Sequence, residues 1–453
     1  MDALEPRRSS EDARAPRYLP ALDGLRALSV SAVLAFHAGV PHFGGGFLGV
    51  EVFFVVSGYL ITSLLLEEQR TSGRIPLARF WLRRARRLLP ALFALLLATL
   101  VLSLTVAPDS LAGTRTDSLA ALLYVSNWWQ VIHHHSYFMD VDRPPLLLHL
   151  WSLAIEEQFY VLWPLALALF GRRPERWVLR VALLAGAASA SWMAWLYDPS
   201  VDPTRVYVGS DTRLSGLLLG AALAVIVPPF AASELLSARA RVVRQVLGAV
   251  GLGALAWLIF RSSSHDPFLY RGGLVLVDLA SAALMVGLLA PNALSRLFSA
   301  GPCAWLGRRS YGLYLWHWPI FALTRPEFDL ALSGAPLLGL RLALTFAVTE
   351  LCYRLLELPI RAGALGRLRT RPWLLGASGA SLAAISLTPR QRFGRTARRC
   401  ARARAPRSAR LSRSGCVQRG GLRGSRAARR PSELDPSGRS ARSGLAQDAH
   451  PAE

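Results

Sequence analysis

Arg26 and His37 are the residues near the start of the chain whose types could do chemistry. Both lie in the mostly apolar segment 19–38, together with Asp23. A charge inside an apolar span is costly, so it marks a candidate functional site. They are eleven positions apart, which is about three helical turns, so both side chains lie on one side of the helix, roughly 16 Å apart along its axis. A histidine there can act as a general base near neutral pH, and an arginine can hold an anion. The alternative is a structural ion pair between Asp23 and Arg26, with His37 at the membrane edge.

Further carboxylates interrupt later apolar segments. Glu51 lies in GVEVFFVVSGYLIT (49–62), where the glycines at 44–46, 49 and 58 would permit close helix packing but do not explain the charge. Ser152, Glu156 and Glu157 follow in HLWSLAIEEQFYVLWP (149–164). Two adjacent carboxylates cannot both face lipid, so we expect them to face a wet cavity or a partner such as Arg213.

Two other segments add candidates. Tyr311 and His317 lie in SYGLYLWHWP (310–319), where the alternative for His317 is a hydrogen-bonded histidine inside a helix bundle. The segment RRARRLLP (83–90) holds a dense cluster of basic side chains, which are Arg83, Arg84, Arg86 and Arg87. Such clusters commonly mark the cytoplasmic side of a membrane protein. They can also form a polyphosphate site, because a guanidinium offers paired donors to phosphate.

The elements that must position these residues are membrane-spanning helices. The chain has 453 residues, of which 52% are hydrophobic, and its apolar blocks reach the roughly 20 residues that a spanning helix needs. So many blocks in series exclude a single soluble core. The sequence predicts an all-α polytopic helical bundle with about eleven transmembrane helices. The expected spans are 19–38, 46–67, 88–107, 150–170, 177–197, 211–228, 243–260, 271–290, 310–325, 337–357 and 372–388.

Arginines in the short loops predict the orientation. They concentrate in the N-terminal extension 1–17 and in the loops 68–87, 171–176, 229–242, 291–309 and 361–371. Because short cytoplasmic loops are rich in basic residues, we expect a cytoplasmic N-terminus and an extracytoplasmic C-terminus in the cell (inner) membrane. The half-apolar segment 118–131 would invert this pattern if it spanned. It is therefore expected to lie at the interface or to re-enter.

Charge and cysteine content limit the kinds of partner and cofactor that are expected. The formal net charge of +23 could indicate nucleic-acid binding, but no such motif accompanies it, and basic loops beside an anionic membrane explain it better. The four cysteines have no CxxC spacing, so neither a metal site nor a disulfide framework is expected. The Arg-rich segment 390–453 cannot bury a core and is expected to be disordered. It is either a genuine tail or the product of a frameshift, and the second is favoured.

Taken together, these blocks resemble the acyltransferase 3 family of membrane-bound O-acyltransferases over residues 18–361. The resemblance rests on LDGLRALSV with the Arg-x10-His pair, GVEVFFVVSGYLIT, RRARRLLP, HLWSLAIEEQFYVLWP, SYGLYLWHWP and ELPIR (357–361). It implies transfer of an acyl group, expected to be acetyl, from cytoplasmic acyl-CoA to hydroxyls of an extracytoplasmic glycan. Lipopolysaccharide O-antigen, peptidoglycan and exopolysaccharide are such acceptors. Acylation of a secondary metabolite and a non-enzymatic transporter are the alternatives.

The resemblance also implies roles for individual residues. His37 would be catalytic with Arg26, as general base or transient acyl carrier, and Glu156 and Glu157 match the family's paired carboxylates. The expected acyl-CoA contacts are Arg83, Arg84, Arg87 and Arg26, and the further candidates are Asp23, Glu51, Ser152, Arg213, Tyr311 and His317. Many members continue after an extra helix, here within 362–389, into an SGNH hydrolase-like domain. The motifs of that domain do not occur after Arg390, so a separate SGNH-type protein is a further expected partner.

Overall fold

The computed structural model describes residues 18–138, 143–171, 173, 175–229, 237–326 and 328–362. Across this part of the chain no strand forms, and the only pairing of the β type is the bridge between Pro326 and Leu330. The predicted all-α class is therefore confirmed. The eleventh predicted span, 372–388, and the tail 390–453 lie outside the described residues.

A helix forms at each of the ten predicted spans that lie within the described residues, although α3 and α13 begin well before the predicted bounds. In chain order they are α1 (Pro20–His37), α2 (Gly49–Ser72), α3 (Leu77–Thr105), α4 (Leu111–Leu122), α5 (Ser126–Ile132), α6 (Trp151–Phe170), α7 (Glu175–Leu196), α8 (Thr204–Val208), α9 (Ser210–Ile226), α10 (Ala238–Arg261), α11 (Leu274–Leu288), α12 (Ala293–Phe298), α13 (Gly301–Ala322), α14 (Gly334–Cys352) and α15 (Leu358–Arg361). Two π-helical turns, Leu269–Gly273 and Tyr353–Glu357, join α11 and α15 to the segments before them.

Six helical segments within the described residues are long and apolar enough to cross a membrane. They are Gly46–Ser72, Leu77–Thr105, Glu175–Leu196, Ala238–Arg261, Leu269–Leu288 and Gly334–Arg361. Of the other helices, α1, α6, α9 and α13 have 17 to 22 residues, and they carry most of the polar candidates. The chain is thus a helical membrane protein, while the count of eleven spans and the orientation remain predictions.

The basic segment before the third span differs from the expectation. Residues 68–87 were predicted as a loop, but α3 already begins at Leu77, so the arginines from position 79 to 87 belong to its first turns. The prediction was wrong because Arg, Leu and Ala are strong helix formers, and the polar stretch continues the apolar helix without a break. At 29 residues, α3 is about 44 Å long and exceeds the hydrocarbon thickness, so its basic end can project beyond the lipid.

The doubtful segment 118–131 forms no long helix. It is divided between α4, with 12 residues, and α5, with 7 residues. A 12-residue helix is only about 18 Å long, which is too short to cross a bilayer. This agrees with the expectation that the segment does not span.

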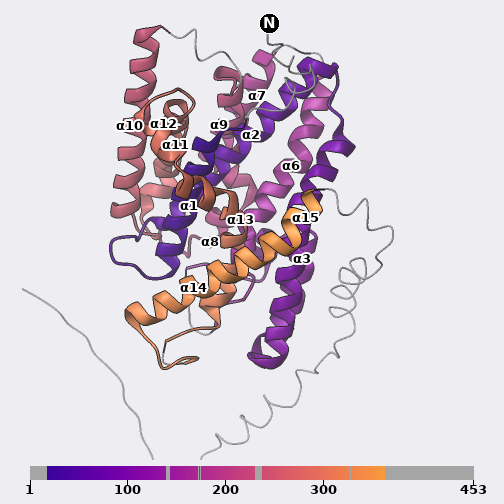
Figure 1. The fold of residues 1–453 in the computed structure, drawn as a ribbon, viewed down its shortest axis with the longest axis vertical. Helices are drawn as coiled ribbons and strands as arrows, with labels where there is room; N and C mark the ends of the chain where they lie inside the picture. Colours follow the sequence, from indigo (N-terminus) through magenta and orange to yellow (C-terminus); the bar gives the residue numbers. More distant parts are fainter. Residues whose placement is uncertain are drawn as a thin grey trace, which may run out of the picture. The chain divides into compact units, whose positions relative to one another are not determined.

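Close helix contacts at glycines hold the centre of the bundle together. A Cβ on Gly58 of α2 would lie 1.8 Å from the Leu217 carbonyl oxygen of α9, and one on Gly307 of α13 would lie 1.8 Å from the Asp23 carbonyl oxygen of α1. Only glycine permits such an approach, and the packing role predicted for Gly58 is confirmed. In Figure 1, α1 and α13 lie near the middle of the bundle. The two helices pack on each other, and His37 of α1 contacts His317 of α13.

Candidate active site

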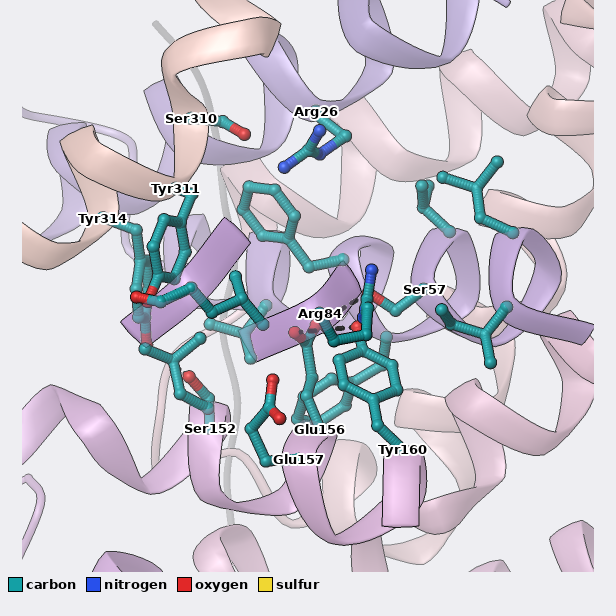
Figure 2. Close-up of a pocket in the computed structure, with 18 of the residues that line it drawn as sticks. Arg26, Ser57, Arg84, Ser152, Glu156, Glu157, Tyr160, Ser310, Tyr311 and Tyr314 are labelled. Atoms are coloured by element: carbon teal, nitrogen blue, oxygen red, sulfur yellow. Dashed lines mark hydrogen bonds between the residues drawn. The ribbon is translucent and has the colours of Figure 1, made fainter. Parts of the chain in front are cut away.

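A cavity opens between α1, α2, α3, α6 and α13 (Figure 2). Its empty volume is ≈ 780 Å³. It is lined by Arg26, Val50, Phe53, Phe54, Val56, Ser57, Leu60, Ile61, Arg84, Arg87, Leu88, Ser152, Leu153, Glu156, Glu157, Tyr160, Ser310, Tyr311 and Tyr314. Five helices that are distant in the sequence therefore bring together seven of the predicted site residues.

Three guanidinium groups face this cavity. Arg84 and Arg87 stand one turn apart on α3, and Arg26 approaches from α1. The Arg84 guanidinium lies 3.9 Å from the centre of the Tyr160 ring, and its buried Nε atom has no hydrogen-bond partner among the described residues. No ion pair to Arg84 or Arg87 occurs in this part of the chain. Guanidinium groups such as those of Arg84 and Arg87, which make no direct ion pair here, are suited to bind an anionic ligand.

Two of the predicted charged site residues, Arg83 and Asp23, do not line the cavity. Arg83 does not line the cavity, because it points to the surface and pairs with Glu68 at 2.5 Å. Asp23 is also outside the lining. It contacts Arg26 at 3.4 Å, which is the (i, i+3) ion pair weighed as the structural alternative, and it accepts a hydrogen bond from Tyr18. Arg26 thus has both an acidic neighbour and a place in the cavity wall.

The carboxylates of α6 face the cavity. This is the first of the two predicted alternatives, a wet cavity or a partner such as Arg213. Glu156 accepts hydrogen bonds from the Ser57 hydroxyl at 2.9 Å and from the Tyr160 hydroxyl at 3.2 Å. Glu157 lines the same wall, and Figure 2 shows both side chains directed toward the space below Arg84. Arg213 is not their partner.

Arg213 instead forms a buried ion pair with Glu51. The Arg213 Nη2 and Glu51 Oε2 atoms are 2.6 Å apart, and each side chain is 1% exposed. Asp278 of α11 lies close by and accepts a hydrogen bond from Ser215 at 2.8 Å. None of these residues lines the cavity, so the pair joins α2 to α9 and accounts for the charge of Glu51 in its apolar run.

Hydroxyl groups on α6 and α13 close one end of the cavity. The Tyr314 hydroxyl donates to the His149 carbonyl oxygen at 3.0 Å and lies 2.6 Å from the Ser152 hydroxyl. Tyr311, in the same wall, donates its hydroxyl to the Leu88 carbonyl oxygen at 2.9 Å. His317 lies one turn after Tyr314 on α13.

His37 and His317 form a hydrogen-bonded pair behind that wall. The His37 Nδ1 and His317 Nε2 atoms are 3.0 Å apart, and the His37 Nε2 atom is 3.1 Å from the Tyr137 hydroxyl. The His317 Nδ1 atom faces the Tyr314 carbonyl oxygen at 2.7 Å and the Leu313 carbonyl oxygen at 3.2 Å. His37 therefore does not line the cavity that holds Arg26, although both residues lie on α1.

These contacts determine the tautomers of the neutral pair. A carbonyl oxygen can only accept, so the His317 Nδ1 atom must carry the proton, and its Nε2 atom is then an acceptor. His37 must donate from Nδ1 to that acceptor, which leaves the lone pair of His37 on Nε2. The Tyr137 hydroxyl donates to this lone pair. His317 thus holds His37 in the form whose Nε2 atom can take a proton from a hydroxyl group.

Aromatic residues and a third histidine surround the pair. The Trp318 ring centre is 4.8 Å from that of His37, and the His149 ring centre is 5.6 Å from that of His317. His149 is fully buried and donates from Nε2 to the Leu315 carbonyl oxygen at 3.1 Å. In the described part of the chain no three His, Cys, Asp or Glu side chains are grouped as metal ligands. The expected absence of a metal remains a prediction.

Sequence reasoning missed Tyr137, Tyr314 and Trp318 as parts of this site. Tyr314 could have been found, because it lies one helical turn from both Tyr311 and His317 and must share their side of α13. Tyr137 could not, since it lies 100 positions after His37 in a connecting segment whose path only the tertiary structure determines.

Sequence comparison places this architecture in a known group. The family described as an acyltransferase domain matches residues 19–354. The chain is 41% identical over 350 residues to the peptidoglycan O-acetyltransferase OatA of Listeria monocytogenes, covering 76% of this chain and 56% of that protein. It is 39% identical over 352 residues to the putative peptidoglycan O-acetyltransferase YrhL of Bacillus subtilis (76% and 55%), and 39% identical over 348 residues to the O-acetyltransferase OatA of Staphylococcus aureus (76% and 58%).

The chain spans a little over half the length of these curated relatives. No solved structure matches it. The family match covers more than half of this chain and includes every cavity-lining residue named above together with His37, His149 and His317. The chain therefore belongs to the acyltransferase 3 family.

Proposed function

We propose that this protein transfers an acetyl group from cytoplasmic acetyl-CoA to a hydroxyl group of an extracytoplasmic cell-wall glycan. The observation that carries the proposal is the arrangement of two centres on either side of Tyr314. On one side lies the cavity with unpaired guanidinium groups, and on the other lies His37 with its lone pair on Nε2. The names of the relatives support peptidoglycan as the acceptor class.

The arginine end of the cavity suits the phosphates of coenzyme A. Arg84 and Arg87 lie in the basic first turns of α3, which the positive-inside rule assigns to the cytoplasm. Phosphate groups there would gain charge-assisted hydrogen bonds without breaking an existing ion pair of either arginine. The thioester would then extend along the cavity toward Ser152 and Tyr314.

The histidine end suits the transfer step. As the acceptor oxygen attacks the thioester carbonyl carbon, His37 Nε2 takes the hydroxyl proton, and the C–S bond breaks to release coenzyme A. His37 can return that proton to the leaving sulfur, so that acetyl ester and thiol are the products. The alternative, in which Nε2 itself carries the acetyl group, uses the same lone pair. His317 stabilises the protonated imidazole in either case, because it continues to accept from Nδ1.

The test of the transfer step is His37→Ala in the membrane-embedded protein. We expect loss of glycan O-acetylation with normal insertion into the membrane. His265→Ala, which changes an exposed loop imidazole, is the matched control. Wild-type acetylation by the His37→Ala protein would refute the proposal.

The test of the donor site compares two neighbouring arginines of α3. Arg87→Ala should raise the KM for acetyl-CoA about tenfold or more, because a hydrogen bond between charged groups contributes about 1.5–3 kcal/mol. Arg83→Ala should leave that KM near the wild-type value, since Arg83 lies outside the cavity. Equal effects of the two substitutions would show that charge on the surface, and not the cavity, binds the donor.

A further inference from the structure

Two hydroxyl groups, those of Ser152 and Tyr314, meet at one end of the cavity that holds the arginines (Figure 2). We propose that they bind the carbonyl oxygen of the thioester and stabilise the negative charge that this oxygen carries during acetyl transfer. This inference rests on the proposed function, and it adds two catalytic residues to His37. The transfer step described above gives neither hydroxyl a role.

The position of Tyr314 brings the hydroxyl pair next to both centres. Its side chain lines the cavity, and its ring centre lies 5.4 Å from that of His317. The Nε2 atom of His317 is in turn 3.0 Å from His37 Nδ1. Ser152 lines the same cavity from α6. A thioester that extends from the arginines to these two hydroxyls therefore reaches the wall behind which His37 lies.

The hydrogen bonds of the pair leave it able to donate to a ligand. The Tyr314 hydroxyl donates to the His149 carbonyl oxygen at 3.0 Å. The Ser152 and Tyr314 oxygens are 2.6 Å apart, so the hydrogen atom between them comes from Ser152. Hydroxyl hydrogens rotate about the C–O bond, so each of the two can turn from its present acceptor to an oxygen atom in the cavity.

The negative charge of the reacting oxygen favours this turn. The present acceptors are a hydroxyl and a peptide carbonyl, both neutral, and hydrogen bonds to a charged oxygen are roughly twice as strong. The thioester oxygen becomes charged when the acceptor hydroxyl attacks the carbonyl carbon and the electron pair of the C=O bond moves to oxygen. That pair returns when the C–S bond breaks. The two donors thus bind the transition state more strongly than the substrate, which is the condition for catalysis.

Burial strengthens the effect. Ser152 is 4% exposed and Tyr314 is 5% exposed, so little water competes for their hydrogen atoms. The alternative is that the pair only joins α6 to α13. A purely structural bond would affect folding and packing, but it would not distinguish one atom of the donor from another.

The experiment therefore changes the hydroxyls and the carbonyl oxygen in turn. The full chain in lipid nanodiscs transfers acetyl to peptidoglycan fragments from acetyl-CoA or from its dithioester analogue. In the analogue, sulfur replaces the carbonyl oxygen and accepts hydrogen bonds only weakly. Ser152→Ala removes one donor and Tyr314→Phe removes the other. The matched control is Tyr59→Phe, which removes a hydroxyl that donates to the Val227 carbonyl oxygen at 3.0 Å and lies outside the cavity lining.

We expect Ser152→Ala and Tyr314→Phe each to lower kcat with acetyl-CoA about 100-fold and to leave the donor KM unchanged. The ratio of kcat for the oxygen donor to kcat for the sulfur donor should fall about tenfold in each variant, because a missing hydroxyl no longer favours oxygen. Tyr59→Phe should keep the wild-type kcat and the wild-type ratio.

A wild-type ratio in both Ser152→Ala and Tyr314→Phe would overturn the assignment, even if kcat falls, because the hydroxyls would then act through packing alone. The His37→Ala protein separates this outcome from failure of the proposed function. Retained acetylation in His37→Ala would overturn the proposed function. An unchanged ratio in an enzyme that still requires His37 would overturn the role of the two hydroxyls and leave the proposed function intact.

Discussion

Replacing His317 tests the reasoning about the histidine pair most directly. His317 is fully buried, and its Nε2 atom accepts the proton of His37 Nδ1 at 3.0 Å. His317→Phe leaves that buried donor without a partner, and no solvent can replace the acceptor. The loss of such a bond to the imidazole, which becomes charged during transfer, should amount to about 1.4–3 kcal/mol. This corresponds to a fall in kcat of about 10- to 150-fold.

The assay separates orientation from binding. With acetyl-CoA as donor, His317→Phe should lower kcat and leave the donor KM unchanged, because His317 lies outside the cavity that holds the arginines. His317→Gln should recover most of the activity, since its amide oxygen can accept from His37. The thermal unfolding temperature of each variant controls for damage to the bundle. Wild-type kcat in His317→Phe, or equal losses in the Phe and Gln variants, would refute the assigned tautomers.

Two further predictions concern stability. Arg213→Met leaves Glu51 as an unpaired buried charge and should lower the free energy of unfolding by about 3–5 kcal/mol. Thermal unfolding in detergent should show this loss, and the double variant Arg213→Met with Glu51→Leu should regain most of it. A loss below about 1 kcal/mol in the free energy of unfolding of Arg213→Met alone would contradict the pairing. The second prediction concerns Asp329. Burial raises the pKa of its carboxyl group, but hydrogen bonds from Arg325 and Arg143 lower this pKa more strongly, to about 2. Because the folded pKa lies below the usual 3.8, the stabilisation is complete above that value and is lost as the pH falls toward 2. The unfolding temperatures of the wild type and Asp329→Asn should therefore differ at pH 6 and converge near pH 2. A difference that stays constant across this pH range would argue against stabilisation by the bonds between Asp329 and the two arginines.

Much of the fold follows from the sequence alone. The apolar blocks predicted the positions of ten helices among the described residues, because a spanning helix must be both long and apolar. The same rule failed at the start of α3. There the basic residues from position 79 to 87 lie in the helix and not in a loop, since helix propensity does not depend on hydrophobicity.

The candidate site was only partly visible in the sequence. Arg26, Glu156 and Glu157 could be recognised one by one, because an ionisable group in an apolar span is costly unless it has a function or a partner. Which of them meet could not be inferred. Arg213 was an expected partner of the α6 carboxylates. Because α2 packs against α9, Arg213 instead forms its ion pair with Glu51.

The sequence by itself determined that this is a helical membrane protein with Arg26 and His37 on the same side of one helix. Only the tertiary structure assigned the two residues to different centres, with Arg26 in the arginine cavity and His37 beside His317. The physical reason is that periodicity fixes the direction of a side chain on its own helix, whereas the neighbour it meets depends on how other helices pack. The contacts of His37 with Tyr137 and His317 join residues 100 and 280 positions away, and no local pattern encodes such distances.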